Sequence, residues 1–220
     1  MIRDPETLQL LLDSIARFVS ERLVPAEGHV AETDQIPDDI VKDMKDLGLF
    51  GMSIPEAYGG MGLTMEEEVM AGFEIARTSP AFRSLFATNN GIGAQGIVID
   101  GTEAQKTHYL PRMVTGEIIG SFALTEPDSG SDAASLRTTA VKDRDHYCLN
   151  GTKRYITNAP EAGIFTVMAR TDGSKKGADG ISAFIVEKGT PGVSLGNIDK
   201  KMGQKGAHTC DVTFDNVLVP

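Results

Sequence analysis

The chain has 220 residues, with 21 Lys or Arg against 31 Asp or Glu, and a formal net charge of −10 at pH 7. This acidic balance argues against nucleic acid as a partner, because a protein that binds a polyphosphate backbone needs a basic surface. Apolar types make up 40% of the residues and charged types 24%, an ordinary globular composition that excludes disordered and collagen-like chains.

The first half of the chain has the apolar spacing of amphipathic helices. Asp4 is placed to cap a helix that begins at Pro5, and apolar residues then recur at three- and four-residue steps as far as Val19. Further helices are expected over about 37–47, after the capping-box pair Thr64 and Glu67, after Ser79, and after Thr102 with Gln105. The pattern predicts a bundle of about five helices in residues 1–118.

Beyond residue 119 the chain changes to short stretches rich in β-branched and aromatic residues, separated by Gly, Asp and Asn. Asn150-Gly151 predicts a type I′ hairpin turn. Further strands are expected at Ile164–Ala169, Ile181–Val186 and Val212–Phe214, with an exposed loop at Thr171–Gly180. We therefore predict a multi-domain α and β chain, with a helical domain over 1–118 and an antiparallel β-barrel domain over 119–220.

Cysteine usage and the first residues bear on the compartment. Cys148 and Cys210 are the only cysteines, so neither a disulfide framework nor a Cys/His metal site is expected. The first residues are acidic where a targeting peptide is basic, and no apolar run approaches the roughly 18 residues of a membrane span. We expect a cytoplasmic protein, or a mitochondrial matrix protein in a eukaryote, without a membrane span.

Two glycine-rich segments have weak claims to bind nucleotides. Gly91–Gly96 matches the GxGxxG dinucleotide pattern, but it lies inside an expected helical stretch instead of following a strand. Close packing of helices is therefore favoured over nicotinamide binding. Tyr58–Gly62 lacks the Lys-Ser/Thr of a phosphate loop, and a loop between helices is expected there.

Another segment, rich in polar residues, has a stronger claim to bind a ligand. Phe122–Asp132 is expected to run from a strand into a turn rich in hydroxyls, glycine and acids. Taken alone, this composition is as typical of an Asx/Ser turn that caps a loop as of a ligand site. Leu149–Asn158 and Met202–Gly206 follow it in order. With Ile54–Gly62 and Gly101–Lys106, these segments resemble the acyl-CoA dehydrogenase family of flavoproteins. The resemblance implies that a helical N-terminal domain and a β-barrel middle domain enclose FAD together with a C-terminal helical bundle.

The implied reaction is α,β-desaturation of an acyl-CoA thioester, in fatty-acid or amino-acid catabolism. A carboxylate base takes the α proton, the β hydrogen leaves as hydride to flavin N5, and an electron-transferring flavoprotein accepts the electrons. The resemblance assigns cofactor binding to Phe122, Ala123, Leu124, Thr125, Gly130, Ser131, Tyr155, Ile156 and Thr157. Among these, the amides of Leu124 and Thr125, with the Thr125 hydroxyl, would bind the pyrimidine end of the flavin. Tyr155, which is Trp in many members, would lie against the ring, and the Thr157 hydroxyl would approach N5.

The same resemblance implies substrate contacts. The candidate substrate-binding residues are Ser131 for CoA and Arg83, Ser84, Leu85 and Thr88 for the acyl pocket. Phe-Arg-Ser at 82–84 resembles the Tyr-Arg-Ser of glutaryl-CoA dehydrogenases, in which Arg meets a distal carboxylate. A dicarboxylyl-CoA is therefore an alternative substrate. Against it, a lone helical Arg is usually solvated, and Ala76 stands where those enzymes have an acid.

The family's catalytic Glu lies in the C-terminal domain, beyond Pro220, so no residue here is assigned as catalytic and the chain alone is expected to be inactive. Either the sequence is part of a longer enzyme, or another chain supplies the bundle. A non-catalytic flavin- or CoA-binding partner subunit stays open, as do the flavin oxidases and monooxygenases of the superfamily. A homo-oligomer is expected at full length, because the family buries part of FAD at a subunit interface.

Overall fold

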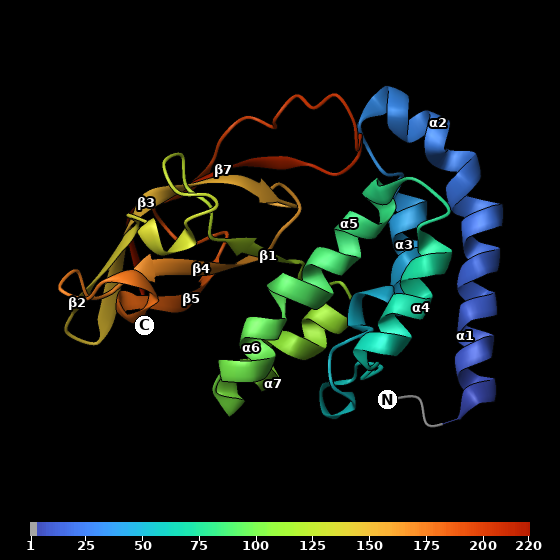
Figure 1. Ribbon diagram of the computed structural model, residues 1–220, viewed down its shortest axis with the longest axis horizontal. Coiled ribbons are helices and arrows are strands. Elements are labelled where there is room, and N and C mark those ends of the chain that lie inside the picture. The colour runs from blue at the N-terminus through green and yellow to red at the C-terminus, as the bar shows by residue number, and fades with distance from the viewer. Residues whose placement is uncertain (1–3) are drawn as a thin grey trace. The chain divides into compact units, whose positions relative to one another are not determined.

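The computed structural model describes residues 4–220, which form two compact units. The helical unit contains the described residues up to Ile118 together with Lys201–Ala207, and the β unit contains Ile119–Lys200 and His208–Pro220. Figure 1 shows the helices of one and the sheet of the other. Among the helices of residues 4–220, none has both the length and the apolar character needed to cross a bilayer.

The helical unit is built from seven α-helices within the described chain. They are α1 (Pro5–Phe18), α2 (Val24–Thr33), α3 (Asp38–Asp46), α4 (Met65–Ile75), α5 (Pro80–Thr88), α6 (Gln95–Asp100) and α7 (Glu103–Val114). The predicted caps are confirmed: the Asp4 carboxylate accepts the N–H groups of the first turn of α1, and Thr64 and Thr102 form capping boxes. The helix α2 was not predicted, and α6 was not predicted as a helix separate from the one that follows Ser79. Helix α2 follows α1 through a π-helical turn at Val19–Leu23.

The GxGxxG pattern lies in a helical setting, as expected. Its residues occupy the π-helical turn Asn89–Gly93 and the beginning of α6, and the pattern follows α5. The buried side chains of Asn89 and Asn90 donate to the carbonyls of Phe50 and Leu49, at 3.0 and 2.5 Å. These bonds hold the π-helical turn against the 3₁₀ turn Leu49–Gly51, whereas a Cβ added at Gly91 would meet nothing within 4 Å.

The β unit is one curled sheet of seven strands within the described residues. They are β1 (Gly120–Ala123), β2 (Thr139–Asp143), β3 (His146–Thr157), β4 (Ile164–Arg170), β5 (Ile181–Glu187), β6 (Val193–Leu195) and β7 (Thr209–Val219). Their order is β1-β4-β2-β3-β7-β6, and β5 pairs with β4. The buried core includes Leu149, Phe165, Val167, Val212 and Phe214.

The prediction of an antiparallel barrel was wrong in its pairing. The sheet is mixed, because β4 runs parallel to both β1 and β2. Between β1 and β4 the chain makes the β2–β3 hairpin and then returns to β1 in the same direction. The expected strands near 164–169 and 181–186 are confirmed as β4 and β5, joined by a mostly exposed loop. Strand β7 is longer than expected, and β2 and β6 were not predicted.

The predicted hairpin turn at Asn150-Gly151 was also wrong. Strand β3 continues through both residues, and the β2–β3 hairpin turns instead at Arg144, whose φ is 55°. A Cβ on Gly151 would lie 2.4 Å from the Oγ1 of Thr138, so glycine here permits a close approach. Asn150 Oδ1 accepts the backbone N–H of Asn216 at 2.9 Å, at an irregularity of the β3–β7 ladder. The Asn-Gly signal therefore indicated a special backbone site but not its type.

Candidate functional site in the β unit

A β-bulge places Tyr155 outside the sheet's core. Opposite the single residue Asp211 of β7, strand β3 presents two residues, Arg154 and Tyr155. The extra residue shifts the inward and outward alternation of β3, so Ile156 is buried while Tyr155 is 60% exposed. Tyr155 adopts a left-handed φ of 57°, which is uncommon for a residue with a side chain. Bulges of this kind are frequent beside active sites, where they aim a side chain.

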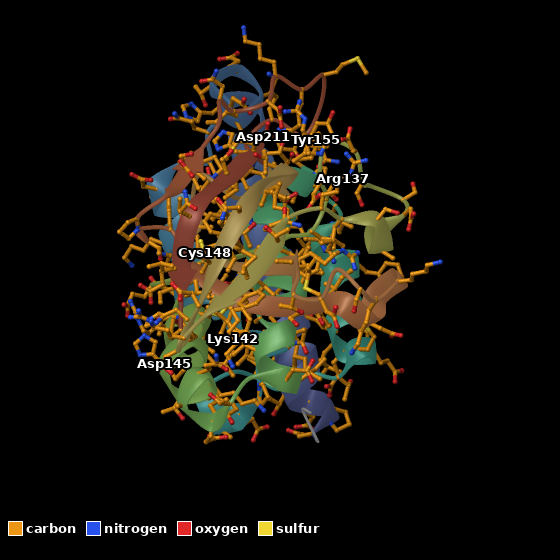
Figure 2. All side chains as sticks on the ribbon, turned by 90° about the vertical axis from the view of Figure 1, so that its left-hand side faces the viewer. Arg137, Lys142, Asp145, Cys148, Tyr155 and Asp211 are labelled. Atoms are coloured by element: carbon orange, nitrogen blue, oxygen red, sulfur yellow. The ribbon has the colours of Figure 1, made fainter. Side chains whose placement is uncertain are left out.

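Arg154 holds the bulge and covers the tyrosine ring. Its Nη1 donates to both carboxylate oxygens of Asp211 at 2.8 Å, and its Nη2 lies 3.8 Å from Asp199. The guanidinium carbon lies 4.6 Å from the centre of the Tyr155 ring, a cation–π contact. Figure 2 shows Tyr155 and Asp211 together at one end of the sheet, away from Asp145. A charged clamp thus fixes an exposed aromatic ring.

The segment that follows β1 offers two backbone donors. The Leu124 carbonyl accepts Lys153 Nζ at 3.0 Å, and the Thr125 carbonyl accepts the Arg154 N–H at 2.7 Å. The N–H groups of Leu124 and Thr125 have no acceptor within residues 4–220, although both residues are half-buried. Since backbone donors away from bulk water are normally paired, two adjacent free N–H groups suit an electron-rich ligand.

A tight turn continues from these donors. Glu126 and Ser129 exchange backbone hydrogen bonds at 2.8 and 3.2 Å, and Ser129 Oγ donates to the Asp132 carbonyl at 2.7 Å. Gly130 and Ser131 are exposed on this turn, and a Cβ at Gly130 would meet nothing within 4 Å. The turn therefore presents an open surface.

A buried ion pair that was not predicted from the sequence lies next to these donors. Lys153 Nζ lies 2.8 Å from a carboxylate oxygen of Glu126, and the two side chains are 0% and 6% exposed. Burial lowers the pKa of Lys153, and Glu126 opposes that shift. Burial raises the pKa of Glu126, but the hydrogen bonds it accepts outweigh burial and hold the pKa below its usual value. Alternation along β3 from Leu149 was the available signal, because it places Lys153 on the core face.

The other predicted cofactor residues lie around these groups. Ala123 and Ile156 are buried, so only their backbones are available to a ligand. Phe122 is half-buried. Thr157 is half-buried, and its carbonyl accepts Ser121 Oγ at 2.5 Å. The β unit therefore brings β1, the turn after it and the bulged end of β3 together.

The predicted acyl-pocket residues lie in the helical unit. A hollow of about 370 Å³ is lined by Pro80, Arg83, Ser84, Ala87, Thr88, Gly91, Ile92 and Gln204. Leu85 is not part of this lining and is 7% exposed. Burial raises the pKa of Glu68 on α4, and the positive charge of Arg83 opposes the rise. An acid near Arg83 was not expected from the sequence, and α4 supplies it.

The β-unit residues fit the flavin that the resemblance implies. A flavin is a flat ring with acceptor atoms at its pyrimidine end, and it gains negative charge there on reduction. The two free N–H groups of Leu124 and Thr125 match those acceptors, and Tyr155 offers a fixed aromatic face.

Two family models and several known proteins match this chain. The model of the acyl-CoA dehydrogenase N-terminal domain matches residues 5–117, and that of the middle domain matches residues 121–217. An acyl-CoA dehydrogenase of Bacillus subtilis is 41% identical over 96% of this chain and 56% of its own length. The solved butyryl-CoA dehydrogenase of Megasphaera elsdenii superposes with a TM-score of 0.91, at 34% identity, over 100% of this chain and 58% of that one.

A glutaryl-CoA dehydrogenase of Mycobacterium smegmatis, solved in complex with FADH2, superposes with a TM-score of 0.89 at 35% identity. The comparison covers 99% of this chain and 54% of that one. The chain thus spans little more than half the length of each of these relatives. Because the two domain models match almost all of it, the chain belongs to the acyl-CoA dehydrogenase family.

Proposed function

We propose that this chain provides the flavin- and acyl-CoA-binding surfaces of an FAD-dependent acyl-CoA dehydrogenase that introduces an α,β double bond into an acyl-CoA thioester. When bound, FAD supplies the acceptor for the β hydride. The observation that carries the proposal is the pair of free N–H groups at Leu124 and Thr125, in the same unit as the exposed Tyr155. Family membership and the FADH2 complex of the Mycobacterium relative support it.

Within this proposal each part of the β unit has a task. The N–H groups of Leu124 and Thr125, with the Thr125 hydroxyl, hold the pyrimidine end and stabilise negative charge there. Tyr155 covers a ring face, and the Thr157 hydroxyl faces N5. Phe122, Ala123, Gly130, Ser131 and Ile156 complete the flavin-binding surface, and Ser131 also contacts CoA. We assign no base to this chain, and we propose an electron-transferring flavoprotein as electron acceptor.

Titration of the flavin-free chain with FAD, followed by quenching of flavin fluorescence, tests the proposal. Tyr155→Ser should weaken binding about tenfold, equivalent to about 1.4 kcal/mol, because the aromatic face is lost. Val141→Ser is the matched control, since Val141 is 61% exposed and Tyr155 60%. A wild-type chain that does not bind FAD, or equal losses in both variants, would contradict the proposal.

A dicarboxylyl-CoA is the second candidate substrate, favoured by Arg83 in the wall of the helical unit's hollow. A distal carboxylate could pair with this guanidinium, in competition with Glu68. The test compares binding of glutaryl- or succinyl-CoA with butyryl-CoA. Arg83→Ala should remove any preference for the distal charge, and an Arg83→Ala chain whose preference is unchanged would refute this candidate.

A further inference from the structure

Lys153 occupies a core position that an apolar residue would normally fill. It follows Leu149 on the inward face of β3, and its side chain is 0% exposed. A buried ammonium is costly unless it is paired and hydrogen-bonded. Lys153 Nζ donates to a carboxylate oxygen of Glu126 at 2.8 Å and to the Leu124 carbonyl at 3.0 Å. The second bond connects this buried charge to the backbone of the proposed flavin site.

That backbone bond determines where the next N–H points. In a trans peptide the C=O of one residue and the N–H of the next lie in the same plane and point in opposite directions. The described chain has no cis peptide. Because Lys153 holds the Leu124 carbonyl, the Thr125 N–H must point away from Lys153. The next peptide obeys the same geometry: Arg154 N–H holds the Thr125 carbonyl at 2.7 Å, and the Glu126 N–H points to Ser129.

Glu126 in turn holds Lys153 in place. Besides the ammonium, its carboxylate accepts the backbone N–H groups of Arg137 at 2.6 Å and Thr138 at 2.9 Å. Glu126 lies at the beginning of the loop between β1 and β2, and its carboxylate is thus fixed by the end of the same loop. Because Glu126 is fixed in this way, the Lys153 ammonium that it binds has little freedom to release the Leu124 carbonyl.

We propose that Lys153 is a positioning residue: without touching the cofactor, it aims the Thr125 N–H at the pyrimidine end of the flavin and so favours the reduced form. The inference rests on the proposed function. Negative charge develops at this end on reduction, so a correctly aimed N–H stabilises reduced flavin more than oxidised flavin. Lys153 and Glu126 are thus part of what sets the redox potential.

The test measures dissociation constants of the 220-residue chain for oxidised and reduced FAD, together with the midpoint potential of the bound flavin. For Lys153→Met we expect reduced FAD to lose at least tenfold more affinity than oxidised FAD. This difference lowers the midpoint potential by about 30 mV for each factor of ten in a two-electron couple. Val217→Ala is the control for lost stability, because Val217 is fully buried in the same core and pairs with Leu149.

Glu126→Gln separates positioning from simple charge. If Lys153 acts only as a positive charge, removing the lysine lowers the potential and removing the glutamate raises it. If the pair acts by positioning, both variants lower the potential, Glu126→Gln by less, because one amide oxygen cannot accept all three donors. A raised potential in Glu126→Gln would overturn the inference.

The outcomes distinguish the inference from the proposed function. A wild-type chain that binds no FAD overturns both. A wild-type chain that binds FAD, beside a Lys153→Met chain with unchanged affinities and potential, overturns the inference alone. Where Lys153→Met is unfolded at the assay temperature, the sign of the Glu126→Gln shift decides.

Discussion

The buried pair of Lys153 and Glu126 leads to a large and testable stability effect. Replacing Glu126 with Ala leaves a fully buried ammonium with a single carbonyl partner, and it also removes the acceptor of two backbone N–H groups. Removing one partner of a buried ion pair typically costs about 3–5 kcal/mol. The two backbone N–H groups that lose their acceptor belong to the same network, so the cost of leaving them unpaired overlaps with this range instead of adding to it.

The matched control lies two residues away on the same turn. Asp128 pairs with Arg137 at 3.3 Å, but the two side chains are 69% and 78% exposed. Asp128→Ala should therefore cost less than about 1 kcal/mol, because an exposed pair contributes little.

Differential scanning calorimetry of the 220-residue chain measures both variants. Glu126→Ala should lower Tm by roughly 6–20 °C, because a loss of about 3–5 kcal/mol corresponds to a change of this size in a chain of about 220 residues. The double variant Glu126→Gln with Lys153→Met should cost less than the sum of the single ones, because it leaves no buried charge unpaired. The reasoning is refuted if Glu126→Ala and Asp128→Ala lower Tm equally, or if the double variant is fully additive.

Three further predictions concern pH, a glycine and the cysteines. Although burial raises it, the pKa of Glu126 lies below its ordinary 4.5 because of the hydrogen bonds it accepts. The ionised group thus adds stability above about pH 4.5 that is lost as the pH falls further, and acid titration of unfolding should show this loss in the wild type but not in Glu126→Gln. Gly151→Ala should lower Tm by several degrees, since its Cβ would lie 2.4 Å from a threonine hydroxyl, whereas Gly173→Ala, with nothing within 4 Å, should leave it nearly unchanged. A thiol reagent should label the half-exposed Cys148 well before Cys210, whose pKa is raised by burial and which is 0% exposed; equal rates would contradict the packing of β7.

Local signals predicted local structure well. The helix starts at Asp4, Thr64 and Thr102 follow from side chains that satisfy N–H groups two or three residues away, so a short window contains the whole cause. The unpredicted helix α2 has Pro25 in its first turn, where proline is tolerated.

Non-local pairing set the limit of prediction. Asn150-Gly151 has the composition of a hairpin turn, but its role depends on Thr138 and on β7, which no short window contains. The parallel direction of β4 depends on where the chain returns to the sheet. The pair of Glu126 and Lys153 joins residues 27 positions apart, so the sequence showed two charges without showing that they meet.

The candidate site residues were predicted from the motif resemblance, and the structure explains how the backbone places them. Tyr155 was predicted as a ring-facing aromatic, but only the bulge opposite Asp211 explains why it leaves the core face. Whether Leu124, Thr125, Tyr155 and Thr157 contact flavin stays a prediction.

The most direct test of the flavin site is an amide proton and nitrogen NMR spectrum of the labelled chain, recorded before and after addition of FAD. The account predicts that the Leu124 and Thr125 N–H resonances shift and that both protons exchange more slowly with solvent, because each gains an acceptor. It is contradicted if FAD binds while these two resonances and their exchange rates stay unchanged, or if saturating FAD alters no resonance of the chain.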